Sequence, residues 1–350
     1  MDNSVFDRFD AIPGLPHEQV MFCEHAATGL RAIIGIHSTV LGPALGGTRF
    51  YAYRDQNSAL TDVLRLSRGM TYKAALAGVP FGGGKAVIMG DPAHSKKPAL
   101  LREYGRFVET LGGRYITAAD IGIDAGDLDT IGGVTRHVVG RSAETGGSGN
   151  SGANTARGVF HAMRAAATVI WGEPTLTERT VGVEGLGKVG SELIALLLAD
   201  GARVLAVDKN STTADRIVER FPEVTLTDHL LDEHLDVYAP CAMGATLTTT
   251  TVPELSAMVV CGAANNQLAT PDIGRLLHDR GVTWVPDYVA NSGGLIQVAG
   301  EHANAGPGWV ADRIEAIYDT VLSILHRAQR EAQQPGLITN QIAESMLAPS

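Results

Sequence analysis

Residues 180–190 read Thr-Val-Gly-Val-Glu-Gly-Leu-Gly-Lys-Val-Gly, a short apolar run followed by glycines spaced Gly185-x-Gly187-x-x-Gly190. The apolar run predicts a β-strand, and the residues from Lys188 onward predict a helix that opens at the glycine turn. A second strand is predicted at residues 203–207, and it ends at Asp208. A strand, a glycine turn, a helix and an acid about 20 residues further on together form the dinucleotide-binding fingerprint.

This fingerprint predicts a site for a nicotinamide cofactor, with NAD favoured. Asp208 is expected to bind the ribose hydroxyls and would repel a 2′-phosphate, although the adjacent Lys209 weakens the preference over NADP. The helix N-terminus favours the negative charge of a pyrophosphate. The alternative is a coincidental glycine-rich turn in an α/β domain. The predicted cofactor cradle consists of Gly185, Leu186, Gly187, Lys188, Val189 and Gly190.

The chain around the fingerprint alternates predicted helices and strands, which indicates an α/β fold with a doubly wound parallel sheet. Residues 145–152 are the strongest break in composition and predict a linker. We therefore expect two domains, residues 1–144 and a Rossmann domain at 145–329, with residues 330–350 returning to the first. Helices are expected at residues 155–171 and 339–347, and a long helix at 312–329. Further strands of the Rossmann domain are expected at residues 236–239, 258–261 and 283–285.

The first domain is also predicted to be an α/β unit. Two β-favouring runs at residues 20–24 and 30–37, joined by a turn, predict a hairpin. Residues 41–49 contain Gly and Pro and predict a loop, and a helix with Ser58 as its N-cap is expected to end near Lys73. The remaining predicted elements are strands at residues 86–89 and 114–117 and a helix at 98–111.

A second glycine-rich stretch, Phe-Gly-Gly-Gly-Lys, occupies residues 81–85. Three consecutive glycines are costly to order, so they are expected where the backbone approaches something closely. Here they are expected to allow a close approach beside Lys85. Lys73 precedes Lys85 by twelve positions, and a lysine close to another cation can act as a base near neutral pH. The alternative is a flexible surface turn with two solvated lysines.

Composition excludes several functional classes. The chain has 350 residues, 45% of them hydrophobic, and a formal net charge of −10, so a basic surface for nucleic acid is not expected. It shows no secretory signal and no apolar run long enough to span a membrane. Cys23, Cys241 and Cys261 form no metal-ligand spacing. We therefore expect a cytoplasmic protein with no metal, no nucleic-acid partner and no membrane partner.

Several long blocks resemble one family, the amino-acid dehydrogenases that act on glutamate, leucine, phenylalanine and valine, and the leucine and valine branch is the most similar. The resemblance implies an N-terminal domain for substrate binding and oligomerisation, a Rossmann domain that binds NAD, a cleft between them, and a homo-oligomer. The matching blocks are residues 41–49, 64–73, 81–85, 120–122, 236–242, 262–268 and 286–294.

The resemblance also assigns roles to residues that contact the substrate. Lys85 is expected to activate the water that attacks an imine, and Asp120 to handle protons at the amino group. Lys73 and Asn291 are expected to bind the α-carboxylate, and backbone contacts are expected from a turn at Gly46 and Gly47. From spacing alone, Asp120 could equally be a helix cap or an ion-pair acid.

On the cofactor side, the resemblance implies that Thr155 and Asn265 lie near the nicotinamide amide. Cys241 and Ala242 are expected near the nicotinamide ribose. The position of Cys241 after a predicted strand fits a buried structural thiol as well.

The side-chain pocket implied by the resemblance is apolar, and its walls are Leu45, Ala118, Leu295 and Val298. A glutamate side chain would leave an unpaired carboxylate there. Leucine, valine and isoleucine differ by single methylenes, worth about 1–3 kcal/mol, so the sequence does not rank them. The expected reaction is NAD-dependent reversible oxidative deamination of such an amino acid to the 2-oxo acid, ammonia and NADH. The alternatives are a phenylalanine dehydrogenase and a catalytically weak NAD-binding sensor.

Two residues depart from the family pattern. Ile123 stands where the leucine and valine enzymes usually have threonine, and Glu184 stands where an uncharged residue usually precedes the fingerprint. Neither removes an expected catalytic group.

Overall fold

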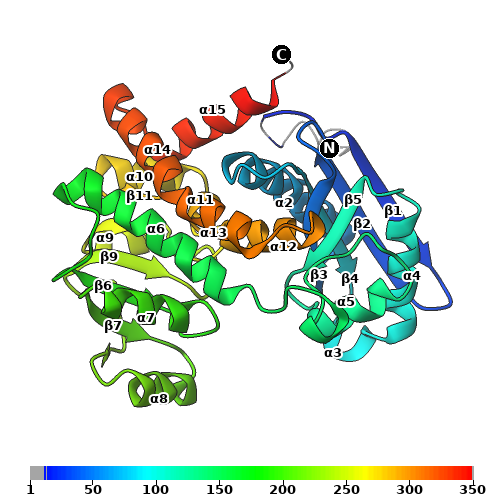
Figure 1. The fold of residues 1–350 in the computed structure, drawn as a ribbon, viewed down its shortest axis with the longest axis horizontal. Coiled ribbons are helices and arrows are strands. Elements are labelled where there is room, and N and C mark those ends of the chain that lie inside the picture. Colours follow the sequence, from blue (N-terminus) through cyan, green and yellow to red (C-terminus); the bar gives the residue numbers. More distant parts are fainter. Residues whose placement is uncertain (1–11, 13, 349–350) are drawn as a thin grey trace. The chain divides into compact units, whose positions relative to one another are not determined.

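The structure is a computed structural model that describes residue 12 and residues 14–348, and contacts between residues divide it into two units (Figure 1). Unit 1 comprises Met1–Asn150, Gln297–Gly306 and Ala343–Ser350, and unit 2 comprises Ser151–Ile296 and Pro307–Ile342. The expected domain limits at 144/145 and 329/330, with the roles attached to them, stay predictions.

Unit 1 is built on a five-stranded sheet in the order β1-β2-β4-β3-β5. β1 and β2 form the predicted antiparallel hairpin, β2 and β4 are also antiparallel, and β3 lies parallel to both β4 and β5. The strands are β1 (Gln19–His25), β2 (Leu30–Ser38), β3 (Ala44–Tyr51), β4 (Gly82–Met89) and β5 (Tyr115–Ala119).

Alternation along these strands gives the sheet two apolar faces, each covered by helices. On one face, Ile34 and Tyr115 pack in a core cluster with residues of α4 (Pro98–Glu109) and α5 (Ala125–Gly132). On the other face, Ile33 and Val87 pack against α2 (Gln56–Leu76). The short α3 (Pro92–Ser95) and a 3-10 turn at Ala143–Thr145 complete the regular elements of residues 14–150.

The helix expected after Ser58 is confirmed, but its ends differ from the prediction. Asp55 is the N-cap, because its carboxylate accepts a hydrogen bond of 2.7 Å from the Ser58 backbone N–H. The helix continues to Leu76, so Lys73 lies in its last turn rather than at or beyond its end.

The loop expected at residues 41–49 is wrong in its second half, because Ala44–Tyr51 forms the strand β3. Gly46 and Gly47 therefore lie inside a strand and do not form a turn. The reason is close packing of the neighbouring strands: a Cβ at Gly46 would lie 1.7 Å from the Gly84 carbonyl oxygen, and one at Gly47 would lie 2.3 Å from that of Ala119.

The three glycines before Lys85 also lie in a strand, at the start of β4. A Cβ at Gly83 would lie 2.0 Å from the Thr71 backbone nitrogen of α2, and one at Gly82 would lie 2.0 Å from the Ser38 carbonyl oxygen. These glycines give room to the protein's own backbone, so the expectation that they open an approach to Lys85 is wrong. The flexible-turn alternative is wrong too, since Lys85 is only 6% exposed.

Unit 2 contains the predicted doubly wound sheet, with six parallel strands in the order β11-β10-β9-β6-β7-β8. The order reverses between β6 and β9, and ligands of such sheets bind at the carboxyl ends of the strands beside this switch point. The strands are β6 (Thr180–Glu184), β7 (Arg203–Val207), β8 (Thr225–Leu226), β9 (Leu235–Pro240), β10 (Ala257–Val260) and β11 (Thr283–Trp284).

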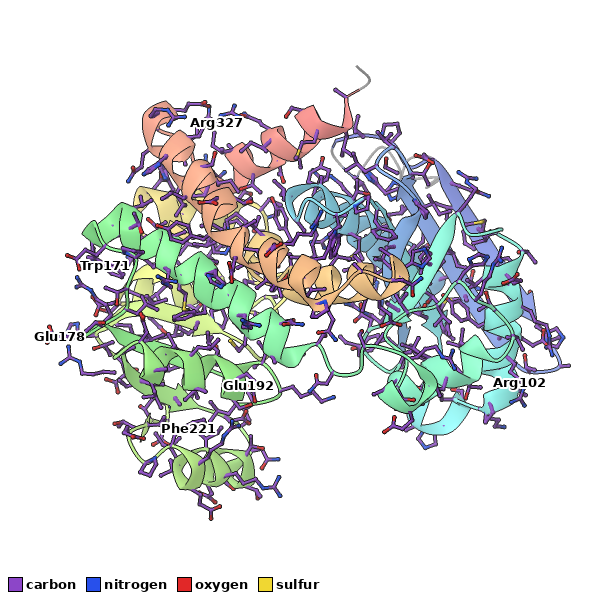
Figure 2. The ribbon with its side chains drawn as sticks, in the orientation of Figure 1. Arg102, Trp171, Glu178, Glu192, Phe221 and Arg327 are labelled. Atoms are coloured by element: carbon purple, nitrogen blue, oxygen red, sulfur yellow. The ribbon has the colours of Figure 1, made fainter. Side chains whose placement is uncertain are left out.

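Helices flank the unit 2 sheet, and the long helix expected at residues 312–329 is interrupted at Ala316 into α13 and α14. Trp171, labelled in Figure 2, is the last residue of α6. The guanidinium of Arg179 lies 4.4 Å from the centroid of its ring. The helices are α6 (Gly152–Trp171), α7 (Gly190–Ala199), α8 (Ser211–Arg220), α9 (Thr251–Glu254), α10 (Asp272–Asp279), α11 (Asp287–Ala290), α13 (Pro307–Glu315) and α14 (Ile317–Glu331).

Two helices contain residues of both units, α12 (Gly293–His302) and α15 (Pro335–Leu347). The unit 1 part of α15 is held by Glu344, which accepts a hydrogen bond from the Tyr72 hydroxyl and lies 3.9 Å from Arg68 of α2. Within the described residues, no helix combines the length and the apolar character needed to cross a membrane.

Candidate active site

A buried ion pair between Lys85 and Asp120 is the centre of the candidate site in unit 1. Lys85 lies in β4, and its Nζ donates a hydrogen bond to Oδ2 of Asp120, which directly follows β5. The N-cap of α5 is Asp124, so Asp120 is an ion-pair acid and not a helix cap. The structure thus decides between the two structural alternatives that the spacing of Asp120 allows.

The charge of Asp120 is set by its surroundings. Burial by itself would raise the pKa of Asp120, but the positive charges of Lys85 and Arg49 outweigh burial and lower this pKa to about 2. Asp120 is therefore a carboxylate at neutral pH. Its second oxygen, Oδ1, accepts a hydrogen bond of 2.6 Å from the Ile121 backbone N–H, so both carboxylate oxygens have a hydrogen-bond partner.

Arg49 is a charged neighbour that the sequence analysis did not assign to the site. Its Nε lies 3.6 Å from Asp120 Oδ1, and its Nη1 donates a hydrogen bond of 2.9 Å to Asp62 on α2. Asp62 also accepts a 2.6 Å hydrogen bond from the Tyr53 hydroxyl. Arg49 is part of the block at residues 41–49. Because a loop was expected there, the alternation of side chains along a strand, which places Arg49 on one face of β3, was not applied to it.

Strand register brings two more predicted residues beside this pair. Gly47 of β3 pairs with Ala118 of β5, and the β3–β4 pairing of Thr48 with Ala86 places Gly47 next to Lys85. Because side chains alternate along strands, Lys85, Gly47 and Ala118 share the face of the sheet that α2 covers in part.

Leu45 and Lys73 belong to the same side of unit 1. Leu45 lies two residues before Gly47 on β3, so it shares this face, and it is only 1% exposed. Lys73, from the last turn of α2, is half-buried. Unit 1 therefore contains two lysines, an acid and uncharged Leu45 and Ala118 on one side of its sheet.

The glycine turn of unit 2 has the geometry that the fingerprint requires. Gly185 has φ +96°, a left-handed conformation that favours glycine, and a Cβ at Gly190 would lie 1.9 Å from the Gly185 carbonyl oxygen. A Cβ at Gly187 would meet no atom within 4 Å. The turn continues through Leu186, Lys188 and Val189, and α7 begins at Gly190.

Asp208 follows β7 and faces the same turn. Its Oδ2 accepts a hydrogen bond of 2.7 Å from the Leu186 backbone N–H, and its Oδ1 accepts one of 2.8 Å from Asn210. The carboxylate therefore braces the glycine turn, and its remaining lone pairs are available to a ribose hydroxyl.

Asn291 and Asn265 lie together in unit 2. The Asn291 side-chain amide donates to Asn265 Oδ1 at 2.9 Å and to the Ala263 carbonyl at 3.0 Å, and Asn291 is buried. Among the residues that the structure describes, the buried Oδ1 atom of Asn291 has no hydrogen-bond partner. Thr155 is in the first turn of α6, where its hydroxyl donates to the Ser151 carbonyl. The structure thus places Asn291 beside a predicted cofactor residue.

Cys241 and Ala242 follow β9 next to the glycine turn. The Cys241 backbone N–H donates to the Glu184 carbonyl at 2.7 Å, and a Cβ at Gly185 would lie 2.6 Å from the Ala242 side chain. Burial raises the pKa of the Cys241 thiol to about 12, so it stays neutral at neutral pH. The unusual Glu184 accepts a hydrogen bond from the buried Tyr238 hydroxyl, which gives its charge a partner.

The other wall residues and the departure at Ile123 have these positions. Leu295 and Val298 are one turn apart on α12, with Leu295 in unit 2 and Val298 in unit 1. Ile123 is 5% exposed and belongs to the unit 1 core, so its apolar side chain is accounted for by packing.

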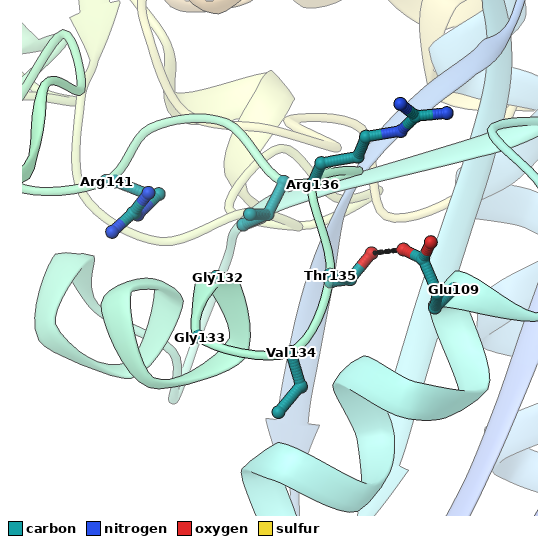
Figure 3. Close-up of a pocket in the computed structure, with 8 residues that line it drawn as sticks. Glu109, Gly132, Gly133, Val134, Thr135, Arg136 and Arg141 are labelled. Carbon is teal, nitrogen blue, oxygen red and sulfur yellow. Dashed lines mark hydrogen bonds between the residues drawn. The ribbon is translucent and has the colours of Figure 1, made fainter.

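The predicted site residues do not line the hollow of about 560 Å³ shown in Figure 3. There the Thr135 hydroxyl donates a 2.6 Å hydrogen bond to Glu109, and Arg136 and Arg141 project from the loop after α5. Across residue 12 and residues 14–348, no group of three His, Cys, Asp or Glu side chains has the arrangement of a metal site.

Comparisons with known proteins identify the family of the chain. Residues 17–137 match the Glu/Leu/Phe/Val dehydrogenase dimerisation domain, and residues 146–216 and 209–339 match the Glutamate/Leucine/Phenylalanine/Valine dehydrogenase family model. The chain is 51% identical over 340 residues to a valine dehydrogenase of Streptomyces albus, which covers 95% of this chain and 92% of that protein. It is 42% identical to a leucine dehydrogenase of Thermoactinomyces intermedius, over 97% of this chain and 93% of that protein.

Among solved structures, the L-tryptophan dehydrogenase of Nostoc punctiforme superposes with a TM-score of 0.83 at 38% identity, covering 95% of this chain and 96% of that one. The two-unit α/β fold and these matches define an amino-acid dehydrogenase of the pyridine-nucleotide-dependent class. The chain belongs to the glutamate/leucine/phenylalanine/valine dehydrogenase family. The predicted family, fold class and enzyme class are thereby confirmed.

Proposed function

We propose that the protein catalyses the reversible oxidative deamination of a branched-chain L-amino acid to the 2-oxo acid and ammonia, with NAD as the cofactor. The observation that carries the proposal is the buried Lys85–Asp120 pair on a face that it shares with the uncharged Leu45 and Ala118, in a chain 51% identical to a valine dehydrogenase. This proposal includes the choice of NAD as cofactor, the role of each site residue, the class of substrate and the oligomeric state.

The residues of unit 2 fit a dinucleotide. Gly187 leaves its surroundings clear, the N-terminus of α7 favours a pyrophosphate, and Asp208 offers acceptor oxygens to a ribose while repelling a 2′-phosphate. We assign Thr155 and Asn265 to the nicotinamide amide and Cys241 and Ala242 to its ribose. When bound, the nicotinamide accepts a hydride from the substrate Cα.

The residues of unit 1 supply the proton chemistry. Lys73 neutralises the substrate α-carboxylate, and Asn291 and the backbone at Gly46 and Gly47 support it. Asp120, ionised at neutral pH, handles the protons of the amino group. Once the substrate is an iminium, Lys85, after releasing its ammonium proton to solvent, accepts a proton from the water that attacks the iminium carbon. Asp120 then returns the proton that it took from the amino group, and ammonia leaves.

The uncharged walls select the substrate class. A γ-carboxylate beside Leu45 and Ala118 would lose its hydration without gaining a cationic partner, which costs several kcal/mol as an order of magnitude. Aliphatic side chains lose no such hydration. A second candidate is an aromatic L-amino acid, which the 38% identity to an L-tryptophan dehydrogenase favours.

We also propose a homo-oligomer in the cytoplasm. The match of residues 17–137 to a domain described as a dimerisation domain supports self-association. The free thiols of Cys23, Cys241 and Cys261 fit a reducing compartment.

A spectrophotometric panel tests the substrate and cofactor. The purified protein is assayed for NADH or NADPH formation with L-valine, L-leucine, L-isoleucine, L-phenylalanine, L-tryptophan and L-glutamate. We expect the highest kcat/KM with an aliphatic substrate and NAD, and none measurable with L-glutamate. A preference for L-phenylalanine or L-tryptophan would establish the second candidate, and inactivity with all six would contradict the proposed function.

A further inference from the structure

Arg49 is a nearly buried cation placed between two carboxylates of unit 1. It lies on β3, with 16% of its side chain exposed. One end of its guanidinium is fixed, because Nη1 donates to Asp62 of α2 at 2.9 Å and Tyr53 holds the same carboxylate oxygen at 2.6 Å. The other side of the guanidinium faces Asp120, with Nε 3.6 Å from Oδ1.

The Nε–H of Arg49 is buried and makes no hydrogen bond among the described residues. Its distance of 3.6 Å to Asp120 Oδ1 exceeds the range of about 2.7–3.2 Å for such a bond. An unsatisfied buried donor on a charged group is costly. A movement of Asp120 by less than about 1 Å would satisfy it.

We propose that Arg49 is a positioning residue for Asp120. While Lys85 is bonded to Oδ2, Arg49 keeps the carboxylate oriented toward Lys85 through Oδ1. When Lys85 turns to the substrate, the Arg49 Nε–H completes a hydrogen bond to Oδ1 and keeps Asp120 charged and in place. This inference rests on the proposed function, because it assumes that Asp120 handles protons in the reaction.

The charges around Asp120 support this role. Lys85 from β4 and Arg49 from β3 are the cations that lower its pKa, against burial. The Asp62 carboxylate lies beyond Arg49, and the hydroxyls of Tyr53 and Tyr115 also interact electrostatically with Asp120. Arg49 is therefore the cation that remains beside Asp120 whenever Lys85 is engaged elsewhere.

Removing the charge of Arg49 has a predictable sign. A carboxylate that loses one of two neighbouring cations becomes easier to protonate, so its pKa rises. If catalysis needs ionised Asp120, the acid limb of the kcat/KM profile moves to higher pH. If Arg49 only connects β3 to α2, its loss would lower the stability or the fraction of active protein, and the acid limb of the kcat/KM profile would not move.

The experiment compares Arg49→Gln, Arg49→Lys and the control Arg65→Gln, an exposed arginine of α2 one turn beyond Asp62. We expect Arg49→Gln to lower kcat about 10- to 100-fold and to move the acid limb up by about 1 pH unit or more. Arg49→Lys keeps the charge but cannot contact both carboxylates. We expect it to lower kcat about ten-fold with the acid limb unmoved. The control should match the wild type in both readouts.

Either variant decides the inference. Wild-type kcat in folded Arg49→Lys overturns it even if Arg49→Gln fails to fold, and an unmoved acid limb in folded Arg49→Gln overturns it as well. Asp120→Asn, measured alongside, separates this inference from the proposed function. Full activity of Asp120→Asn contradicts the proposed role of Asp120, whereas an inactive Asp120→Asn beside a wild-type-like Arg49→Gln contradicts only the role of Arg49.

Discussion

The two glycine-rich stretches of this molecule, each beside or around a lysine, differ in the space that surrounds their glycines. At Gly82–Gly84 in unit 1, an added Cβ would collide with the protein itself, as at Gly83, where it would lie 2.0 Å from the Thr71 nitrogen. In the turn of unit 2, Gly185 has positive φ, and a Cβ at Gly187 would meet nothing within 4 Å. Lys85 beside the first stretch is buried, whereas Lys188 inside the second is exposed.

The difference shows that a run of glycines has at least two physical causes. In β4 the glycines let α2 and neighbouring backbone pack closely, which places Lys85 inside the unit. In the unit 2 turn, Gly190 serves packing, but Gly187 keeps a surface clear for a ligand. Substitutions at the two stretches should therefore separate loss of catalysis, loss of folding and loss of cofactor binding.

The largest effect is expected from the two lysines. Lys85→Ala removes the proposed base, and we expect kcat to fall by at least about 10³-fold while NADH binding, followed by fluorescence titration, is unchanged. The matched variant Lys188→Ala should keep kcat within about three-fold and raise only the KM for NAD, because an exposed contact to a phosphate contributes about 1 kcal/mol or less. Steady-state activity of Lys85→Ala within ten-fold of wild type would contradict the proposed role of Lys85 as the base.

The next effect concerns folding. Gly83→Ala forces a methyl group into the backbone of α2, and such overpacking costs about 3 kcal/mol. We expect a fall in Tm of about 10 °C, measured by circular dichroism. Gly69→Ala is the control, and it lies on α2, the helix that Gly83 packs against. The Cβ of alanine at position 69 would meet nothing within 4 Å. We expect its Tm to be unchanged or higher, since alanine is more favourable than glycine in a helix by about 1 kcal/mol. If the two variants had the same Tm, close packing against α2 would not be the reason for a glycine at position 83.

The smallest effect is expected at Gly187. Because a methyl group there meets no protein atom, Gly187→Ala should leave Tm within about 2 °C while raising the KM for NAD about ten-fold, which corresponds to about 1.4 kcal/mol. Gly190→Ala, whose Cβ would lie 1.9 Å from the Gly185 carbonyl oxygen, should lower Tm instead. An unchanged KM for NAD in Gly187→Ala would show that the clear space is not used by the cofactor.

Much of the fold could be predicted because its signals are local. The hairpin at the start, the helix that carries Lys73, and the strand, turn and helix around Gly185 follow from apolar periodicity and turn residues in short windows. The helix caps were less predictable, because Asp55 and Ser58 are both favoured N-cap residues and only the backbone decides between them. The interruption between α13 and α14 at Ala316 could not be predicted, because the spacing of apolar residues does not change there.

By itself, the sequence determined a parallel α/β sheet with a dinucleotide turn, two lysines at a fixed spacing, and an acid after a strand. The tertiary structure decided that residues 44–51 form an internal strand between β4 and β5, because glycines in a short stretch of sequence indicate a loop as readily as a closely packed strand. It also decided that Arg49 faces Asp120, since that contact depends on the register of β3 between β4 and β5. Strand register is a long-range property, so no short stretch of sequence contains it.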